Sequence, residues 1–158
     1  MEILSFSYQG DFFCIKVTDV HEVINSVTPV MLPRIPDPFE GVFQHRGNVF
    51  SLMSFGRCMT RFHGIISTEV QDSQIIIFAE PYHQFAIRVP MPLETISIER
   101  DEISVVAPEK FSAAILDGIV NRGEQRYHLI SAMKLFLHAG KLITEAENAR
   151  QFRKGIDF

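Results

Sequence analysis

The stretch "FEGVFQHRGNVFSLMS", residues 39–54, places Gly47 and Asn48 between two apolar runs. A two-residue turn of this kind matches the twist of paired strands, so the stretch predicts a β-hairpin with Arg46 facing Val49 across the turn. Counting outward from that pair assigns alternate side chains to opposite faces of the hairpin. One face, expected in the core, then carries Phe43, His45, Phe50 and Leu52, and the half-exposed face carries Val42, Gln44, Arg46, Val49 and Ser51.

Strand-like segments continue on both sides of this hairpin. Two apolar runs near the N-terminus, residues 2–8 and 12–17, are separated by turn residues and predict a second hairpin. Four prolines between residues 28 and 39 remove backbone donors and exclude a regular element there. We therefore predict a mainly β protein of short antiparallel strands closed into barrels or sandwiches. Further apolar runs of the same character cover residues 74–81, 83–90, 93–98 and 104–109.

Only the end of the chain has helical composition. Thr144 and Glu147 have the spacing of a capping box, and good helix formers follow as far as Gly155. A shorter helical turn over residues 131–140 is expected just before it. The predicted organisation is a β domain over residues 1–140, followed by a C-terminal helical extension over residues 141–158.

Part of the central hairpin recurs later in the chain. Gly41, the Arg46-Gly47 pair and residues 52–54 (Leu-Met-Ser) have counterparts, in the same order, in Gly118, the Arg122-Gly123 pair and residues 129–131 (Leu-Ile-Ser). The spacing within the two copies differs by one residue, so the recurrence reflects either a duplication or a coincidence. A duplication would favour two small related barrels over one large barrel.

Composition excludes several classes of function. The chain has 158 residues, a net charge of −4 and 46% hydrophobic residues, which is typical of a soluble globular domain. Its basic residues are scattered, so we expect no nucleic-acid partner. No apolar run approaches the ~20 residues that a bilayer span requires, and no secretion signal is visible at the N-terminus. The expected compartment is the cytoplasm, where Cys14 and Cys58 would be reduced core thiols.

The residues give little support to an enzyme. Six histidines never occur with metal-ligand spacing, and no glycine-rich phosphate loop is present, so we predict no metal, no cofactor and no catalytic residue. Cys58 with His63 could be combined into a thiol site, but no third group would orient them. A second alternative is a small ligand-binding barrel, in which the 14 phenylalanines would line a pocket instead of filling a core.

Several segments, taken in order, resemble the CheW-type coupling proteins of bacterial chemotaxis. The likeness spans most of residues 2–137. The segments are "VHEVI" (20–24), the proline-rich "VTPVMLPRIPDPFEGV" (27–42), "QHRGNVFSLMSF" (44–55) and "GIVNRGEQRYHLISAMKLF" (118–136).

The resemblance implies two small five-stranded β-barrel subdomains that share an apolar interface, with a C-terminal helix. It also implies a non-enzymatic adaptor that joins the regulatory domain of a CheA-type histidine kinase to the cytoplasmic tip of a methyl-accepting chemoreceptor. By position, the partner-binding residues would be Val20, Glu22, Arg46, Gly47 and Asn48.

Some positions depart from the family pattern. Ser51 and Ser54 replace a proline and an aspartate, and Pro90 and Pro92 interrupt a segment that is a strand in the family. The resemblance therefore supports a kinase contact more strongly than a receptor contact. An adaptor for a different, non-chemotaxis partner therefore remains open beside the main prediction.

Overall fold

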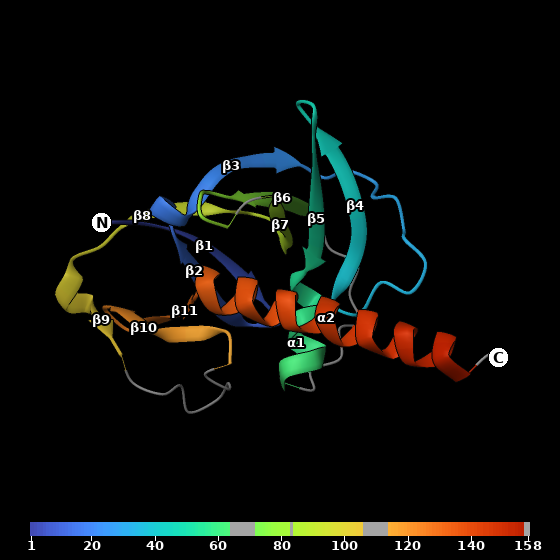
Figure 1. Ribbon diagram of the computed structural model, residues 1–158. Helices are drawn as coiled ribbons and strands as arrows, with labels where there is room; N and C mark the ends of the chain where they lie inside the picture. Colours follow the sequence, from blue (N-terminus) through green and yellow to red (C-terminus); the bar gives the residue numbers. More distant parts are fainter. Residues whose placement is uncertain (64–71, 83, 106–113, 157–158) are drawn as a thin grey trace.

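The computed structural model describes residues 1–63, 72–82, 84–105 and 114–156. These residues form two β-sheets, with the helix α1 (Phe55–His63) and the longer α2 (Ala132–Ile156) packed against them (Figure 1). Sheet A contains, in spatial order, β8 (Glu94–Ser97), β1 (Glu2–Tyr8), β2 (Asp11–Lys16), β11 (Gln125–Ile130), β10 (Leu116–Arg122) and β9 (Ile103–Ser104). Sheet B contains β3 (Val20–Asn25), β6 (Ser73–Phe78), β7 (Phe85–Pro90), β5 (Asn48–Ser54) and β4 (Phe39–His45).

The mainly β prediction is confirmed, and the details of the sheets correct it. Sheet A has six strands instead of five, and each sheet contains one parallel pair, β2 with β11 and β5 with β7, among antiparallel neighbours. Among the described residues no hydrogen-bonded ladder joins the two edge strands of either sheet, so they are open sheets and the barrel description is not confirmed. The predicted run 104–109 lies mostly outside the described residues.

The two sheets repeat one pairing pattern. The order β3-β6-β7-β5-β4 in sheet B corresponds to β8-β1-β2-β11-β10 in sheet A, with the same parallel and antiparallel neighbours. The hairpins β4–β5 and β10–β11 each have a register shift just before a glycine, Gly41 or Gly118. The recurrence in the sequence therefore has a counterpart in the structure. In sheet B the hairpin β6–β7 follows helix α1 in the chain. The corresponding hairpin of sheet A, β1–β2, lies instead at the N-terminus.

Phenylalanine rings form much of the core between the sheets. Phe55 of α1 lies edge-on to Phe6 of β1 and packs on Phe13 of β2, with ring centroids 4.8 and 4.9 Å apart. All three side chains are buried. This packing supports the interpretation of the phenylalanines as core residues over the alternative of a ligand pocket. Each sheet adds a smaller apolar cluster, which in sheet B contains Phe43, Leu52, Ile75, Ile77 and Ala86.

The helices differ from the sequence prediction. Helix α1 was not predicted. Serine is a typical residue at the start of a helix, and in the structure the Oγ of Ser54 accepts a hydrogen bond from Arg57 N at 3.3 Å. The two predicted helical pieces are one continuous helix, α2, which Ser131 caps by accepting from Lys134 N at 3.1 Å. Thr144 is therefore not a cap. It lies within α2, and its hydroxyl donates to the Gly140 carbonyl at 3.0 Å.

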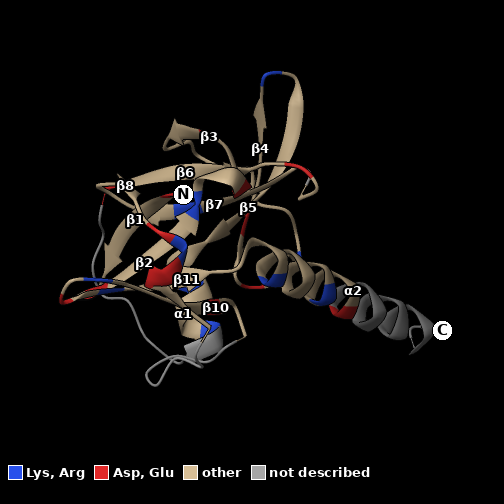
Figure 2. Cartoon of the chain, turned by 90° about the vertical axis from the view of Figure 1, so that its left-hand side faces the viewer, with Lys and Arg blue, Asp and Glu red and all other residues tan. Residues whose placement is uncertain are grey.

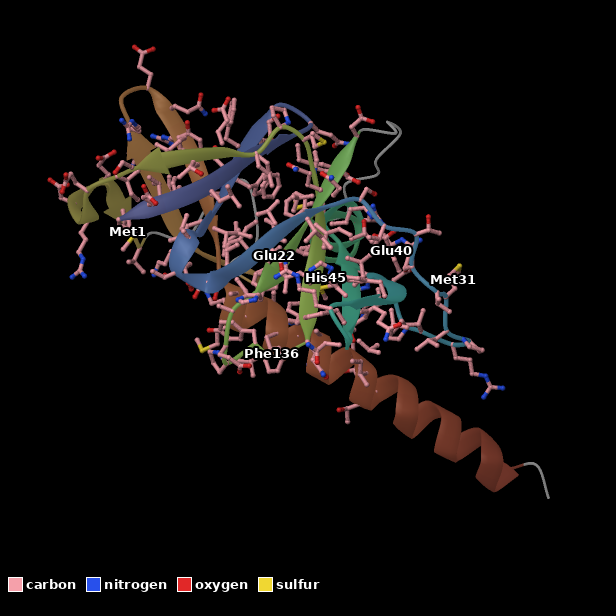
Figure 3. The ribbon with its side chains drawn as sticks, turned by 90° about the horizontal axis from the view of Figure 1, so that it is seen from above. Met1, Glu22, Met31, Glu40, His45 and Phe136 are labelled. Carbon is pink, nitrogen blue, oxygen red and sulfur yellow. The ribbon has the colours of Figure 1, made fainter. Side chains whose placement is uncertain are left out.

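The proline-rich connection carries no helix or regular strand, as predicted, but it is tied to sheet B. Val30 N donates to Val42 O at 2.7 Å, and Val42 N donates to Val30 O at 2.9 Å. Gly41 permits this close approach, because a Cβ there would lie 2.2 Å from the Val30 carbonyl oxygen. The bridge leaves Val30, Met31 and Leu32 exposed, and Figure 3 shows Met31 on the outer side of the molecule. None of the described helices is long and apolar enough to cross a bilayer.

Candidate interaction site at the tip of the central hairpin

The hairpin β4–β5 stands out from the rest of sheet B and has a basic tip (Figures 1 and 2). Its turn is shifted from the predicted register, because His45 pairs with Asn48 and the turn residues are Arg46 and Gly47. Both have positive φ, 49° and 81°, as a type I′ turn requires. The observed pairing is displaced by two residues from the predicted one. Because side chains alternate between the two faces of a strand, each side chain keeps the face that was predicted for it. Phe43 and Leu52 are buried as expected.

Glu22 joins the opposite edge of sheet B to this tip. It lies on β3 opposite Ile77 of β6, after a register shift at His21. Its Oε1 lies 3.0 Å from Arg46 Nη2, and its Oε2 lies 3.1 Å from His45 Nε2. Figure 3 shows Glu22 and His45 side by side near the centre of the view. One carboxylate therefore connects edge strand β3 to edge strand β4, which the sheet ladder does not do.

These contacts fix the position of Arg46. A left-handed conformation costs a non-glycine residue about 1–2 kcal/mol, and an ion pair at this exposure offsets only part of that cost. The Arg46 side chain is 73% exposed, whereas the Glu22 side chain is 23% exposed. Glu22 thus holds Arg46 from below while most of the guanidinium faces solvent. A guanidinium held in this way loses little further entropy when it meets a carboxylate or carbonyl groups on another protein.

Arg88 connects the same two edges at the other end of sheet B. On β7, its Nε donates to Glu40 Oε2 of β4 at 2.8 Å. Its Nη2 donates to Val27 O at 2.7 Å, and its Nη1 donates to the hydroxyls of Ser26 and Ser73. The Arg88 and Glu40 side chains are mostly buried, at 19% and 18% exposure. Charged clusters therefore lie at both ends of the apolar interior of sheet B.

The remaining predicted site residues fall into two groups. Gly47 and Asn48 are exposed at the hairpin tip beside Arg46, and Val49 next to them is 52% exposed. Val20 lies elsewhere, at the start of β3, where it is partly buried against the core between the sheets. Sequence reasoning missed the role of His45, which it assigned only to the core face. Glu22 is recognisable in the sequence as a charged residue. Because it lies far from His45 along the chain, no local pattern indicates that the two side chains are in contact.

The residues considered for catalysis do not form an active site in the described part of the chain. Cys58 is fully buried, and burial raises the pKa of its thiol to about 12. Its Sγ lies 3.7 Å from Met53 Sδ in the core, an environment that favours the neutral thiol over the reactive thiolate. The side chain of His63 lies outside the described residues. No group of three or more metal-ligating side chains gathers in the described ranges.

Two adjoining sheets of repeated topology, one of them carrying a protruding hairpin with a charged tip (Figure 2), define the class of this β-sheet protein. The CheW-like domain family matches residues 2–147, and the chain belongs to this family. The fold is similar to that of the scaffolding protein TtCheW from Thermoanaerobacter tengcongensis, with a TM-score of 0.72 and 23% identity over 83% of this chain and 84% of that one. No curated protein sequence matches the chain.

Proposed function

We propose that this protein is a non-enzymatic adaptor of chemotaxis-like signalling that acts in the cytoplasm. It would join the regulatory domain of a CheA-type histidine kinase to the cytoplasmic tip of a chemoreceptor. Membership in the CheW-like family supports this proposal, and so does one observation. Arg46 is held at a protruding turn by Glu22 while 73% of its side chain remains exposed. An ordered arginine in such a position is a frequent hot spot of protein interfaces.

The site residues then have different parts in binding. Arg46, Asn48 and the neighbouring Val49 would contact a partner directly, because they are exposed at the tip. Glu22 would act mainly by positioning, since both of its carboxylate oxygens already contact His45 and Arg46. Gly47 would preserve the turn through its φ of 81°. Val20 would support β3 from the core side.

The proposal can be tested by calorimetric titration with the kinase regulatory domain and, separately, with a receptor-tip fragment from the same organism. Arg46→Ala is expected to weaken binding to at least one of them by about 1–3 kcal/mol, the range of interface hot spots. The matched control is Arg126→Ala, since Arg126 is an exposed arginine on the β10–β11 hairpin. Unchanged affinity of Arg46→Ala for both partners would remove the role given to this arginine.

Reversing the charge of Glu22 is expected to distinguish the kinase contact from the receptor contact. By its position in the resemblance, Glu22 is assigned to the kinase contact, so we expect Glu22→Lys to weaken kinase binding more than receptor binding. Glu22→Gln keeps the size and hydrogen-bonding capacity of the side chain and should have a smaller effect on both titrations. Equal losses for the two partners would contradict this division. Circular dichroism of each variant would show that the sheets are intact.

A further inference from the structure

His45 lies at the end of β4, directly before the turn of the central hairpin. Its backbone is fixed in the sheet by pairing with Asn48, whereas Arg46, the next residue, lies in the turn with a φ of 49°. The His45 side chain is 24% exposed, and the centroid of its ring lies 6.5 Å from that of Phe50. Its Nε2 lies 3.1 Å from Oε2 of Glu22. A side chain with a fixed backbone and a partly covered ring thus contacts a charged group on another strand.

The hydrogen bond between His45 and Glu22 has a fixed direction. A carboxylate accepts hydrogen bonds, so Nε2 of His45 carries the proton and donates it. Hydrogen bonds to a charged group are stronger than those between neutral groups. Both side chains are mostly buried, so solvent screens this contact less than it screens a contact at the surface. The imidazole of His45 therefore holds one oxygen of the Glu22 carboxylate in place.

The ion pair between Glu22 and Arg46 is more exposed than this hydrogen bond. It joins Oε1 of Glu22 to Nη2 of Arg46 at 3.0 Å, but 73% of the arginine side chain is exposed. An exposed ion pair contributes little, because holding two long side chains in one geometry costs entropy. Here His45 already holds the glutamate by its other oxygen, so only the arginine remains to be ordered. The order of Arg46 thus depends on the contact between His45 and Glu22.

We propose that His45 is a positioning residue of the hairpin tip, which fixes the Glu22 carboxylate and thereby orders the Arg46 guanidinium for a partner. The consequence for binding rests on the proposed function, whereas the order of Arg46 is a property of the free protein. Without the imidazole, Glu22 would contact only Arg46 in this cluster, and both long side chains would gain rotamer freedom. A partner would then have to order the Arg46 side chain on binding, which weakens affinity.

Nitrogen-15 relaxation of the arginine Nε–Hε groups in the free protein tests the ordering directly. His45→Leu removes the donor and should lower the order parameter of Arg46 toward that of Arg126, an exposed arginine of the β10–β11 hairpin. His45→Gln should restore most of the order, because its amide can donate at a similar reach. A role of the ring in packing alone would not be restored by glutamine.

The matched control is His138→Leu. It changes another half-buried histidine, on helix α2, which lies away from the hairpin tip (Figure 1), so the order parameter of Arg46 should stay the same. An unchanged or higher order parameter of Arg46 in His45→Leu would overturn the proposal, and so would the absence of recovery in His45→Gln.

Calorimetric titration then relates the ordering to binding. For whichever of the two proposed partners the wild type binds, His45→Leu should raise the dissociation constant about two- to tenfold, the effect of immobilising one long side chain. In the Arg46→Ala background the same substitution should have no effect, because His45 acts through Arg46. A loss of equal size in that background would overturn the proposal. Absence of any binding by the wild type would refute the proposed function instead, and the relaxation measurements would still decide the role of His45.

Discussion

Replacing Gly41 with alanine is expected to destabilise the protein severely. Its φ of 146° is unfavourable for a residue with a Cβ, and the added atom would lie 2.2 Å from the Val30 carbonyl oxygen. Strain of this kind costs about 1–3 kcal/mol. Separating residue 30 from β4 would also remove the two backbone hydrogen bonds of the Val30–Val42 bridge, at about 0.5–1.5 kcal/mol each. Together these losses amount to roughly 2–6 kcal/mol, a large part of the ~5–15 kcal/mol typical of a domain.

Urea denaturation followed by circular dichroism measures this loss, and other glycines supply matched controls. Gly47→Ala meets the positive φ of 81° but no atom within 4 Å, so it should cost only about 1–2 kcal/mol. Gly140→Ala, in open space within a helix, should instead stabilise by about 0.5–1 kcal/mol. Equal losses for the Gly41 and Gly47 variants would refute the reasoning, because they would show that the contact with residue 30 adds nothing.

Other substitutions test the rest of the structure. Arg88→Met should lower the free energy of unfolding by about 3–5 kcal/mol, because it leaves the mostly buried Glu40 carboxylate unpaired, and the double variant with Glu40→Gln should recover part of that loss. Burial raises the pKa of both Cys14 and Cys58 from 9.0 to about 12. The folded state therefore holds these protons where the unfolded state releases them, so stability should fall as pH rises above about 9, by up to about 1.4 kcal/mol per thiol per pH unit. Urea titrations at pH 8 and pH 10 of the wild type and the Cys58→Ala variant would show whether the slope lessens. Ser54→Ala should cost about 1 kcal/mol through loss of the α1 cap, and a thermal melt would detect it.

Local patterns were sufficient to predict much of the fold. Alternating apolar residues located β1, β2 and β4–β8 to within a few residues, and the prolines located the irregular connection. The central hairpin shows where such reasoning fails. Gly47-Asn48 is the better turn by composition, but the structure uses Arg46-Gly47, and the contact of Arg46 with Glu22 offsets part of the cost of its left-handed conformation. That contact comes from a distant strand and has no local signal.

The missed helix and the sheet order have the same kind of explanation. Helix α1 begins at a serine cap, and its buried residues Phe55, Cys58 and Met59 have helical spacing, but nine residues form too short a pattern to stand out after the apolar run of the hairpin. The parallel pairs β2–β11 and β5–β7 join segments far apart in the chain, and periodicity carries no information about such partners. For the candidate site, the resemblance named Glu22 and Arg46 among the partner-binding residues without bringing them together. Their direct contact and the part of His45 required the structure.

The N-terminal origin of the hairpin β1–β2 affects how the chain can fold while it is being made. Sheet B is built from residues 20–90 and can assemble as soon as they leave the ribosome. Sheet A needs both the first strands and β11, which ends at Ile130. At about 5–20 residues per second, the forty residues between 90 and 130 take roughly 2–8 s to synthesise. During that time the earliest strands lack β11, so sheet B is expected to form first and to provide the surface on which sheet A is completed.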